Sequence, residues 1–300
     1  MAITQAQLDA LKTTLKAKFN AGLALTPDDW RKVAGYVKSD SKSNTYAWLS
    51  QFPAFREWVG SRQHKALAEK AYNVVNKKFE ATIDVQRTDI EDDLLGHYSS
   101  IAEGQGQAAK DLMNDLIFQA YAAGFSSPCY DDQYFFDTDH PVYANEDGTG
   151  AVTSVSNMQA GTGAPWILLC TKRAPKPVYL QERVTVQFES QTTAASPIVF
   201  DQDVYSFGGR WRGNAAYGFW QCAFGSKADL TVANFEAAYD AMMNFDGDGH
   251  RKLGIVADTM LVGPSNRAKA EAILAKEKIN GGDSNTNYRR LELIVTPWMP

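Results

Sequence analysis

Residues 98–125 carry the strongest periodic signal in this 300-residue chain. Apolar side chains recur there at positions i, i+1, i+4 and i+5, which places them on one stripe of an α-helix. The stripe consists of Ala108, Ala109, Leu112, Met113, Leu116, Ile117, Ala120 and Tyr121. The polar residues between them are expected to face outward: Lys110, Asp111, Asn114 and Asp115. Gly124 follows as a C-terminal stop, so we predict one long helix with strand-like sequence on both sides of it.

Composition and charge place the chain in a broad class. It is 44% hydrophobic and 22% charged, with a formal net charge of -5. These values are typical of a soluble globular protein long enough for two hydrophobic cores. No apolar run reaches the roughly 20 residues that a membrane span needs. The mild acidity does not favour sequence-specific nucleic-acid binding.

The N-terminal residues predict an amphipathic helix. Thr4 and Gln7 have the spacing of a capping box, and apolar residues follow on one helix face: Leu8, Leu11, Leu15 and Phe19. A second short helix is expected to begin near Pro27, with Trp30 on its apolar side. We interpret residues 1–42 as an N-terminal arm.

An aromatic segment follows between residues 46 and 60. Its density of large aromatic side chains is rarely left in water, and the candidates for buried contacts are Trp48, Phe52, Phe55 and Trp58. One interpretation is a structural cluster that fastens the arm to a core; the other is a platform on which a ligand stacks. We expect these four residues to lie at a contact between subunits.

Residues 62–93 predict an extended hairpin. Apolar and polar residues alternate from Phe79 to Val85, as in a half-buried strand, and we expect the chain to turn near Lys77. A two-stranded hairpin is marginal alone, so its apolar face needs another surface, and its length suggests that this surface belongs to another subunit. Positive charge lies toward the expected tip and negative charge at its return: Lys77 and Lys78, then Asp89, Glu91, Asp92 and Asp93. We expect these to be inter-subunit contacts; a solvated face is the alternative.

The rest of the chain alternates between strand and helix patterns, which makes the fold class α+β. Strands are predicted at residues 166–170, 184–188, 217–224, 255–262 and 291–295. Helices are predicted at residues 231–244 and 265–276.

Few residues in the sequence have the pattern of a catalytic or metal site. Asp137, Asp139 and His140 could act as metal ligands, but no second ligand pair matches them, and acidic residues before a proline are typical of turns. Nucleotide-binding, hydrolase and zinc-protease motifs are absent. The three cysteines are odd in number and widely spaced, which favours reduced, buried thiols. We therefore expect no catalytic residues, no cofactor and no metal.

Several short stretches together resemble the major head (capsid) protein family of Mu-like phages over nearly the whole chain. They are residues 43–49, 52–53, 56–60, 76–80, 89–93, 135–137, 140–143 and 217–220. The resemblance implies the Hong Kong 97-type capsid fold, with an N-terminal arm, an extended loop, a peripheral domain built on a spine helix, and an axial domain. We assign residues 1–42 to the arm, 43–97 to the aromatic segment and hairpin loop, 98–227 to the peripheral domain and 228–300 to the axial domain.

The resemblance also implies partners and location. The protein is expected to assemble with itself into pentamers and hexamers of a shell, with a scaffolding protein and a portal as further partners. The shell would enclose double-stranded DNA without sequence-specific binding, and the net negative charge suits such a container. We expect a location in the virion capsid after synthesis in the bacterial host cytoplasm, with no membrane partner.

Two other functions remain as hypotheses. One is an encapsulin-type shell that encloses an enzyme cargo, for which we identify no cargo groove in the sequence. The other is a metal-dependent hydrolase that uses Asp137, Asp139 and His140.

Overall fold

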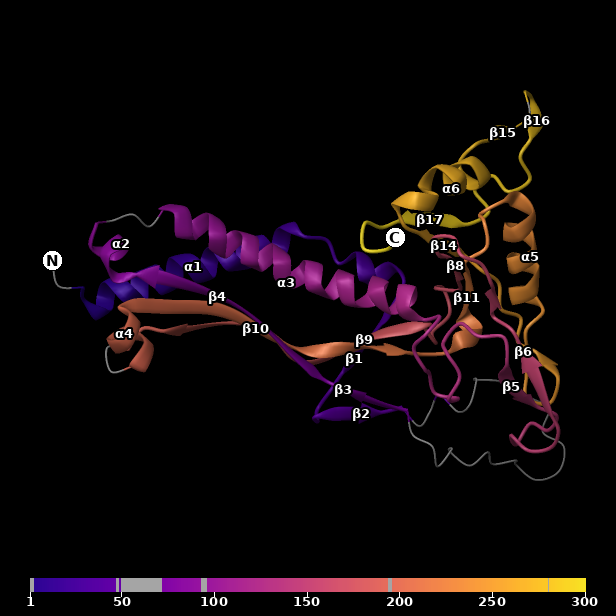
Figure 1. Ribbon diagram of the computed structural model, residues 1–300, viewed down its shortest axis with the longest axis horizontal. Helices are drawn as coiled ribbons and strands as arrows, with labels where there is room; N and C mark the ends of the chain where they lie inside the picture. Colours follow the sequence, from indigo (N-terminus) through magenta and orange to yellow (C-terminus); the bar gives the residue numbers. More distant parts are fainter. Residues whose placement is uncertain (1–2, 47–48, 50–71, 93–95, 194–195, 280) are drawn as a thin grey trace.

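The computed structural model describes residues 3–46, 49, 72–92, 96–193, 196–279 and 281–300. Two long helices lie along a long sheet, and a second sheet with two shorter helices adjoins one end of it (Figure 1). The first helix begins at the far tip of the elongated part, and the C-terminus lies near the junction of the two parts. The α+β class predicted from the sequence is confirmed.

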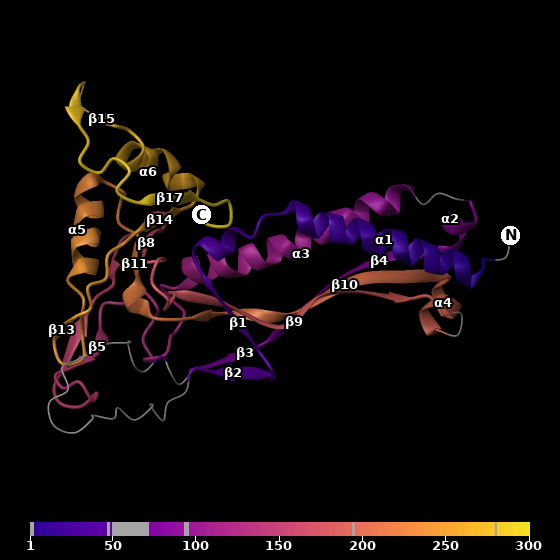
Figure 2. The same cartoon turned by 180° about the vertical axis from the view of Figure 1, so that it is seen from behind.

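The two long helices are α1 (Gln5–Leu25) and α3 (Gly96–Ala123), which run side by side (Figure 2). The predicted capping box is present, because Thr4 Oγ1 accepts the N–H of Gln7 and Gln7 Oε1 accepts the N–H of Thr4. The four apolar residues predicted for one face of α1 are all buried. The residues predicted as an arm therefore pack on α3 of the same chain.

Two glycines bring these helices together. A Cβ atom on Gly22 would lie 1.9 Å from the carbonyl oxygen of Glu103, and one on Gly106 would lie 2.0 Å from that of Phe19. No side chain fits at such distances. The backbones of α1 and α3 approach this closely because glycine stands on each side of the contact.

The long helix α3 occupies the predicted range but turns a slightly different face inward. Met113, Ile117 and Tyr121 are buried as expected, whereas Leu116 is only half-buried. Asn114, predicted to face solvent, is buried, and this part of the prediction was wrong. The amide of Asn114 is satisfied by backbone groups near the start of the 3-10 helix η1 (Asp29–Lys32), so its burial leaves no polar group unpaired.

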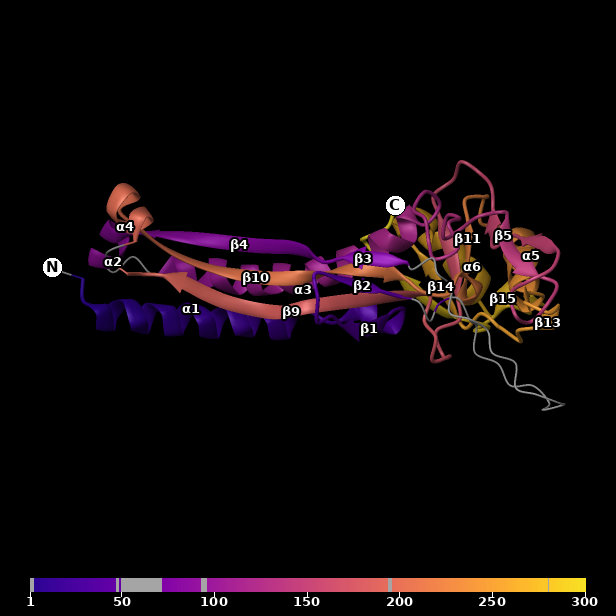
Figure 3. The same cartoon turned by 90° about the horizontal axis from the view of Figure 1, so that it is seen from below.

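The long sheet has the strand order β1-β9-β10-β4 (Figure 3). Its strands are β1 (Gly35–Lys38), β9 (Val178–Gln191), β10 (Val204–Tyr217) and β4 (Lys77–Gln86). β10 is antiparallel to both of its neighbours, and β1 is parallel to β9. α1 and α3 lie over one face of this sheet. β4 is therefore an edge strand whose alternation buries Ile83 and Val85, as predicted.

The hairpin turn predicted near Lys77 was wrong. β3 (Asn73–Val75) pairs with β2 (Ser43–Thr45), and only Asn76 separates β3 from β4. The polar residues 76–78 predicted a turn because Asn76 is followed by two lysines. The Asn76 side chain is buried instead, where it donates to Ser39 Oγ at 2.8 Å and accepts from Gln181 Nε2 at 2.7 Å. The chain continues into the edge strand.

The second sheet has the order β17-β14-β8-β11-β7. Its strands are β17 (Glu292–Val295), β14 (Thr259–Val262), β8 (Trp166–Leu169), β11 (Ala223–Ser226) and β7 (Met158–Gln159). All residues of β8, β11 and β14 are buried. The hydrogen bonds of this sheet cross the boundary predicted between residues 227 and 228, so that boundary does not separate the two sheets. Along the sequence, the long β9–β10 pair stands between β8 and β11, although β8 and β11 are neighbours in the second sheet.

Short elements complete the fold. The helices are α2 (Arg87–Glu91), α4 (Pro197–Gln202), α5 (Val232–Met243), α6 (Arg267–Leu274), η3 (Trp220–Cys222) and η4 (Pro264–Asn266). Two-residue or four-residue strands pair as β5 (His140–Tyr143) with β6 (Val152–Val155), β12 (Asp246–Gly247) with β13 (Arg251–Lys252), and β15 (Lys278–Ile279) with β16 (Asp283–Ser284). The predicted strand at residues 217–224 is interrupted by η3, and the one at 255–262 begins only at Thr259.

The cysteines agree with the prediction from the sequence. Cys129, Cys170 and Cys222 are all buried free thiols. No helix in the described part of the chain is both long enough and apolar enough to cross a membrane.

Candidate assembly surfaces

The predicted contact residues Lys77 and Lys78 begin the edge strand β4, and both are exposed. Neither ammonium group has an ion-pair partner among the described residues. An edge strand also presents backbone groups that no neighbouring strand uses. The described part of the chain thus leaves this end of β4 open to contact.

A third positive charge lies beside them. Lys78 stands directly opposite Arg212 of β10, so the two side chains share one face of the sheet. The Nε–H of Arg212 is buried and has no hydrogen-bond partner among the residues described. Like charges in directly opposed positions destabilise an antiparallel pair. We call Lys77, Lys78 and Arg212 the basic patch; the sequence pattern did not identify Arg212, which is distant from the lysines in the chain.

The predicted acidic residues that the structure describes lie at the other end of β4, in and directly after α2. Glu91 and Asp92 are exposed, and Asp89 is half-buried and accepts a hydrogen bond from the hydroxyl of Tyr98. β4 rises by roughly 3.3 Å per residue, which separates the basic patch from this acidic end by about 30 Å. The two groups of charge cannot meet within one chain.

The aromatic residues Trp48, Phe52, Phe55 and Trp58 lie outside the described residues, as does Asp93. Two residues near Trp48, Tyr46 and Leu49, are described. The Tyr46 hydroxyl donates to Gln181 Oε1 at 2.7 Å, and the side chain of Leu49 is buried in the main core. The start of the aromatic segment is thus anchored on its own subunit.

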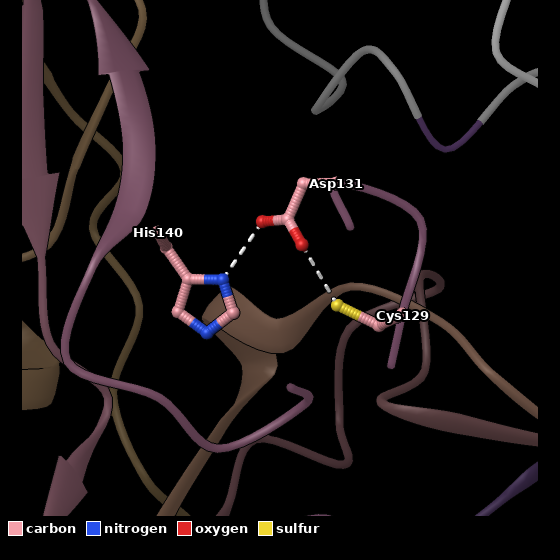
Figure 4. Close-up of side chains that lie close together, drawn as sticks. All are labelled: Cys129, Asp131 and His140. Carbon is pink, nitrogen blue, oxygen red and sulfur yellow. Dashed lines mark hydrogen bonds and ion pairs between the residues drawn. The ribbon is translucent and has the colours of Figure 1, made fainter. Parts of the chain in front are cut away.

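The residues considered as metal ligands are arranged differently from the hypothesis. His140 Nδ1 lies 2.7 Å from Asp131 Oδ2 (Figure 4). Neither ring nitrogen bonds to Asp137 or Asp139. Asp137 instead accepts the backbone N–H groups of Tyr134 and Thr138. Among the described residues, Asp137, Asp139 and His140 do not form a group whose potential ligand atoms all lie within 4.8 Å of one another, and the turn interpretation accounts for Asp137.

His140 belongs to another cluster, which includes Cys129 and Asp131. Cys129 Sγ lies 3.0 Å from Asp131 Oδ1. Burial alone would raise the pKa of Asp131, but hydrogen bonds from His140, Cys129 and the Gln133 N–H outweigh it and hold the pKa below its ordinary value. Burial also raises the pKa of the Cys129 thiol. Cys129 and Asp131 were not predicted together as ligands, although they stand two residues apart in the sequence.

A long helix along an elongated sheet, with a second sheet at its end, is the architecture of a phage capsid subunit. The subunit of the procapsid of bacteriophage JBD30 has this fold: it superposes with a TM-score of 0.86 at 43% identity, covering 99% of this chain and 100% of that one. The fold is therefore the Hong Kong 97-type capsid fold that the sequence predicted.

The family model described as Mu-like prophage major head subunit gpT matches residues 8–299, and the chain belongs to this family. It is 38% identical over 305 residues to the major capsid protein of Escherichia phage Mu, covering 100% of both chains. It is 42% identical over 306 residues to the Mu-like prophage FluMu major head subunit of Haemophilus influenzae, covering 99% of both. The protein is a major capsid protein of a Mu-like phage, which decides against the encapsulin hypothesis.

Proposed function

We propose that the chain forms the pentamers and hexamers of an icosahedral shell that encloses double-stranded DNA. Identical subunits close into rings when heterologous contacts repeat by rotation. The net charge of -5 supports a container that does not hold nucleic acid tightly. A scaffolding protein and a portal are the further partners in this proposal, and assembly takes place in the host cytoplasm.

Within this proposal the elongated part is the peripheral domain. It contains α1, α3 and the sheet β1-β9-β10-β4, so residues 1–42 belong largely to it. The axial domain then comprises the second sheet with α5 and α6. This division revises the predicted domains, because β8 and β11 now belong with β14 and β17.

The basic patch supports a specific contact between subunits. Lys78 and Arg212 repel each other across β4 and β10, and the buried Arg212 Nε–H still lacks an acceptor in the described part of the chain. A carboxylate from a neighbour would relieve both conditions. We propose that Asp89, Glu91, Asp92 and Asp93 of one subunit meet Lys77, Lys78 and Arg212 of another.

A charge-reversal experiment tests this contact. Lys77→Glu with Lys78→Glu should reduce the fraction of chain that sediments as shells. The same variant places a carboxylate opposite Arg212, so the unassembled subunit should be no less stable. Adding Glu91→Lys and Asp92→Lys should restore assembly.

The matched control reverses two exposed lysines on α1, Lys12→Glu with Lys16→Glu. Its change in net charge equals that of the first variant, so a general effect of charge on assembly would appear in both. Shells from the Lys77→Glu, Lys78→Glu variant in wild-type yield would refute the contact.

The aromatic segment is the second proposed contact. Residues 46–72 connect β2 to β3, and we propose that Trp48, Phe52, Phe55 and Trp58 become protected when subunits assemble. Trp58→Ala could then weaken assembly by roughly 2 kcal/mol or more, as at an interface hot spot. Hydrogen exchange at residues 46–60 should slow strongly between free subunits and shells. Equal protection in both states would assign these residues to the core of a single subunit.

Electron microscopy of the purified protein tests the shell itself. Closed particles are expected, and particles recovered from infected cells should contain nuclease-protected double-stranded DNA. Protein cargo in place of DNA would contradict the proposal.

A further inference from the structure

We propose that Cys129, Asp131 and His140 form a binding site for a zinc-type divalent metal ion. One potential ligand atom from each residue lies within 4.8 Å of the others. The three side chains converge from the turn after α3 and from the start of β5 (Figure 4). Thiolate, carboxylate and imidazole together are a ligand set that suits Zn²⁺, whereas Mg²⁺ and Ca²⁺ prefer oxygen ligands alone.

A neighbouring amide fixes which nitrogen of His140 faces the cluster. The Nδ2 group of Asn157 donates to the carbonyl oxygen of Phe135 at 2.8 Å, which leaves its Oδ1 as an acceptor. That oxygen receives the backbone N–H of Asp137 at 2.9 Å and lies 3.2 Å from His140 Nε2. Nε2 must therefore carry a proton, and Nδ1 is the nitrogen directed at Asp131. Histidine ligands in metal sites are commonly oriented by such an outer hydrogen bond.

The carboxylate of Asp131 occupies the centre of the cluster. Its Oδ2 lies 2.7 Å from His140 Nδ1, and its Oδ1 accepts from the Cys129 thiol at 3.0 Å and from the Gln133 N–H at 3.2 Å. The short contact requires one proton between Nδ1 and Oδ2, and the Cys129 thiol carries a second. A metal ion takes the place of both: it binds Nδ1, the thiolate and one carboxylate oxygen, and the two protons pass to solvent.

The surroundings favour a rigid and largely buried site. The His140 side chain is fully buried and stacks on Trp220 at 4.1 Å between ring centroids. The turn that carries Cys129 is closed by backbone hydrogen bonds, from Cys129 to Gln133 and from Phe135 to Ser127. The Asp131 side chain is 10% exposed to solvent. A water molecule can enter there as the fourth ligand.

Metal bound at this position would fasten the turn after α3 to β5. A ligand that binds only the folded chain stabilises it in proportion to the logarithm of its concentration. The melting temperature of the subunit should therefore rise with free Zn²⁺. This effect is independent of assembly and of the basic patch.

The test uses the full-length unassembled chain after treatment with a chelator. Titration with Co²⁺ should give a thiolate-to-metal charge-transfer absorption that saturates at one equivalent per chain. Zn²⁺ should abolish this absorption by competition, release about two protons per ion and raise the melting temperature. Cys129→Ser should lose the absorption, and Asp131→Asn should weaken Co²⁺ binding.

The control is Cys170→Ser, which removes another buried thiol outside the cluster and should bind Co²⁺ as the wild-type chain does. The wild-type titration tests the proposal even if one of the variants fails to fold. Absence of a thiolate absorption in the wild-type chain would overturn the proposal. Equal loss in Cys170→Ser and Cys129→Ser would do so as well.

Discussion

Asn114 Oδ1 accepts a hydrogen bond from the backbone N–H of Trp30 at 3.0 Å, across 84 positions of sequence. The Nδ2 group of the same side chain donates to the carbonyl oxygen of Pro27 at 3.1 Å. One amide thus ties α3 to the segment that leads from α1 into the long sheet. The indole of Trp30 is buried beside this contact.

Replacement of Asn114 by Leu should destabilise the subunit. It would leave the Trp30 N–H and the Pro27 carbonyl without a partner, and each buried unsatisfied group costs about 1–3 kcal/mol. Denaturant unfolding of unassembled chains would measure the loss. Gln107→Ala, at an exposed position of the same helix, should change the free energy of unfolding by no more than about 0.5 kcal/mol. Similar values for the two variants would mean that the amide contributes nothing.

Gly106→Ala and Gly104→Ala should have effects of opposite sign. Alanine in a helix is ordinarily favoured over glycine by about 1 kcal/mol, and a Cβ on Gly104 meets nothing within 4 Å, so that variant should gain stability. At Gly106 the Cβ would lie 2.0 Å from the Phe19 carbonyl oxygen, and α1 must move away from α3. Thermal unfolding of both proteins provides the comparison. Stabilisation by Gly106→Ala would show that the two helices do not approach this closely.

Ile117→Ala should cost more than Leu116→Ala. Ile117 is fully buried, and truncating such a residue costs roughly 2–5 kcal/mol. Leu116 is half-buried, so its loss should fall below this range, although the sequence pattern placed both on the inner face. The difference in free energy of unfolding between the variants reports which face of α3 meets the core. An equal or larger cost at Leu116 would show that the buried face of α3 is the one predicted from the sequence.

Acid should weaken the junction between β8 and β14 through Asp258. Burial alone would raise the pKa of this carboxyl, but hydrogen bonds from Thr171, Lys172 and Thr259 outweigh it, so the folded-state pKa lies below the ordinary value of 3.8. A lowered pKa means that the carboxylate stabilises the fold fully above pH 3.8. This contribution is lost as the pH falls through the folded-state pKa.

Asp258→Asn removes the titrating group and should therefore flatten that part of the stability profile. Unfolding free energies of both proteins measured between pH 7 and pH 2 provide the test. Asp201→Asn, an exposed position on α4, is the control. A wild-type profile parallel to that of Asp258→Asn below pH 4 would contradict the assignment.

Local signals in the sequence determined much of the elongated part. The capping box and apolar face of α1, the range of α3 and the alternation of β4 were all read correctly, because spacing along one element decides which of its side chains face the same way. The helix α5 was found for the same reason. The resemblance to Mu-like head proteins also identified the fold and the family.

The tertiary structure decided what depends on contacts between distant segments. β10 was largely missed because Gly208, Gly209 and Gly213 weaken a strand pattern, yet Gly209 leaves room for Phe19 of α1. Asn114 was assigned to solvent because its polarity was visible in the sequence and its backbone partners were not. Strand register places Lys78 opposite Arg212. The reversal of the chain after α3 places Asp131 between Cys129 and His140. No periodicity within one segment encodes such pairs, since their energy arises only when folding brings separate segments together.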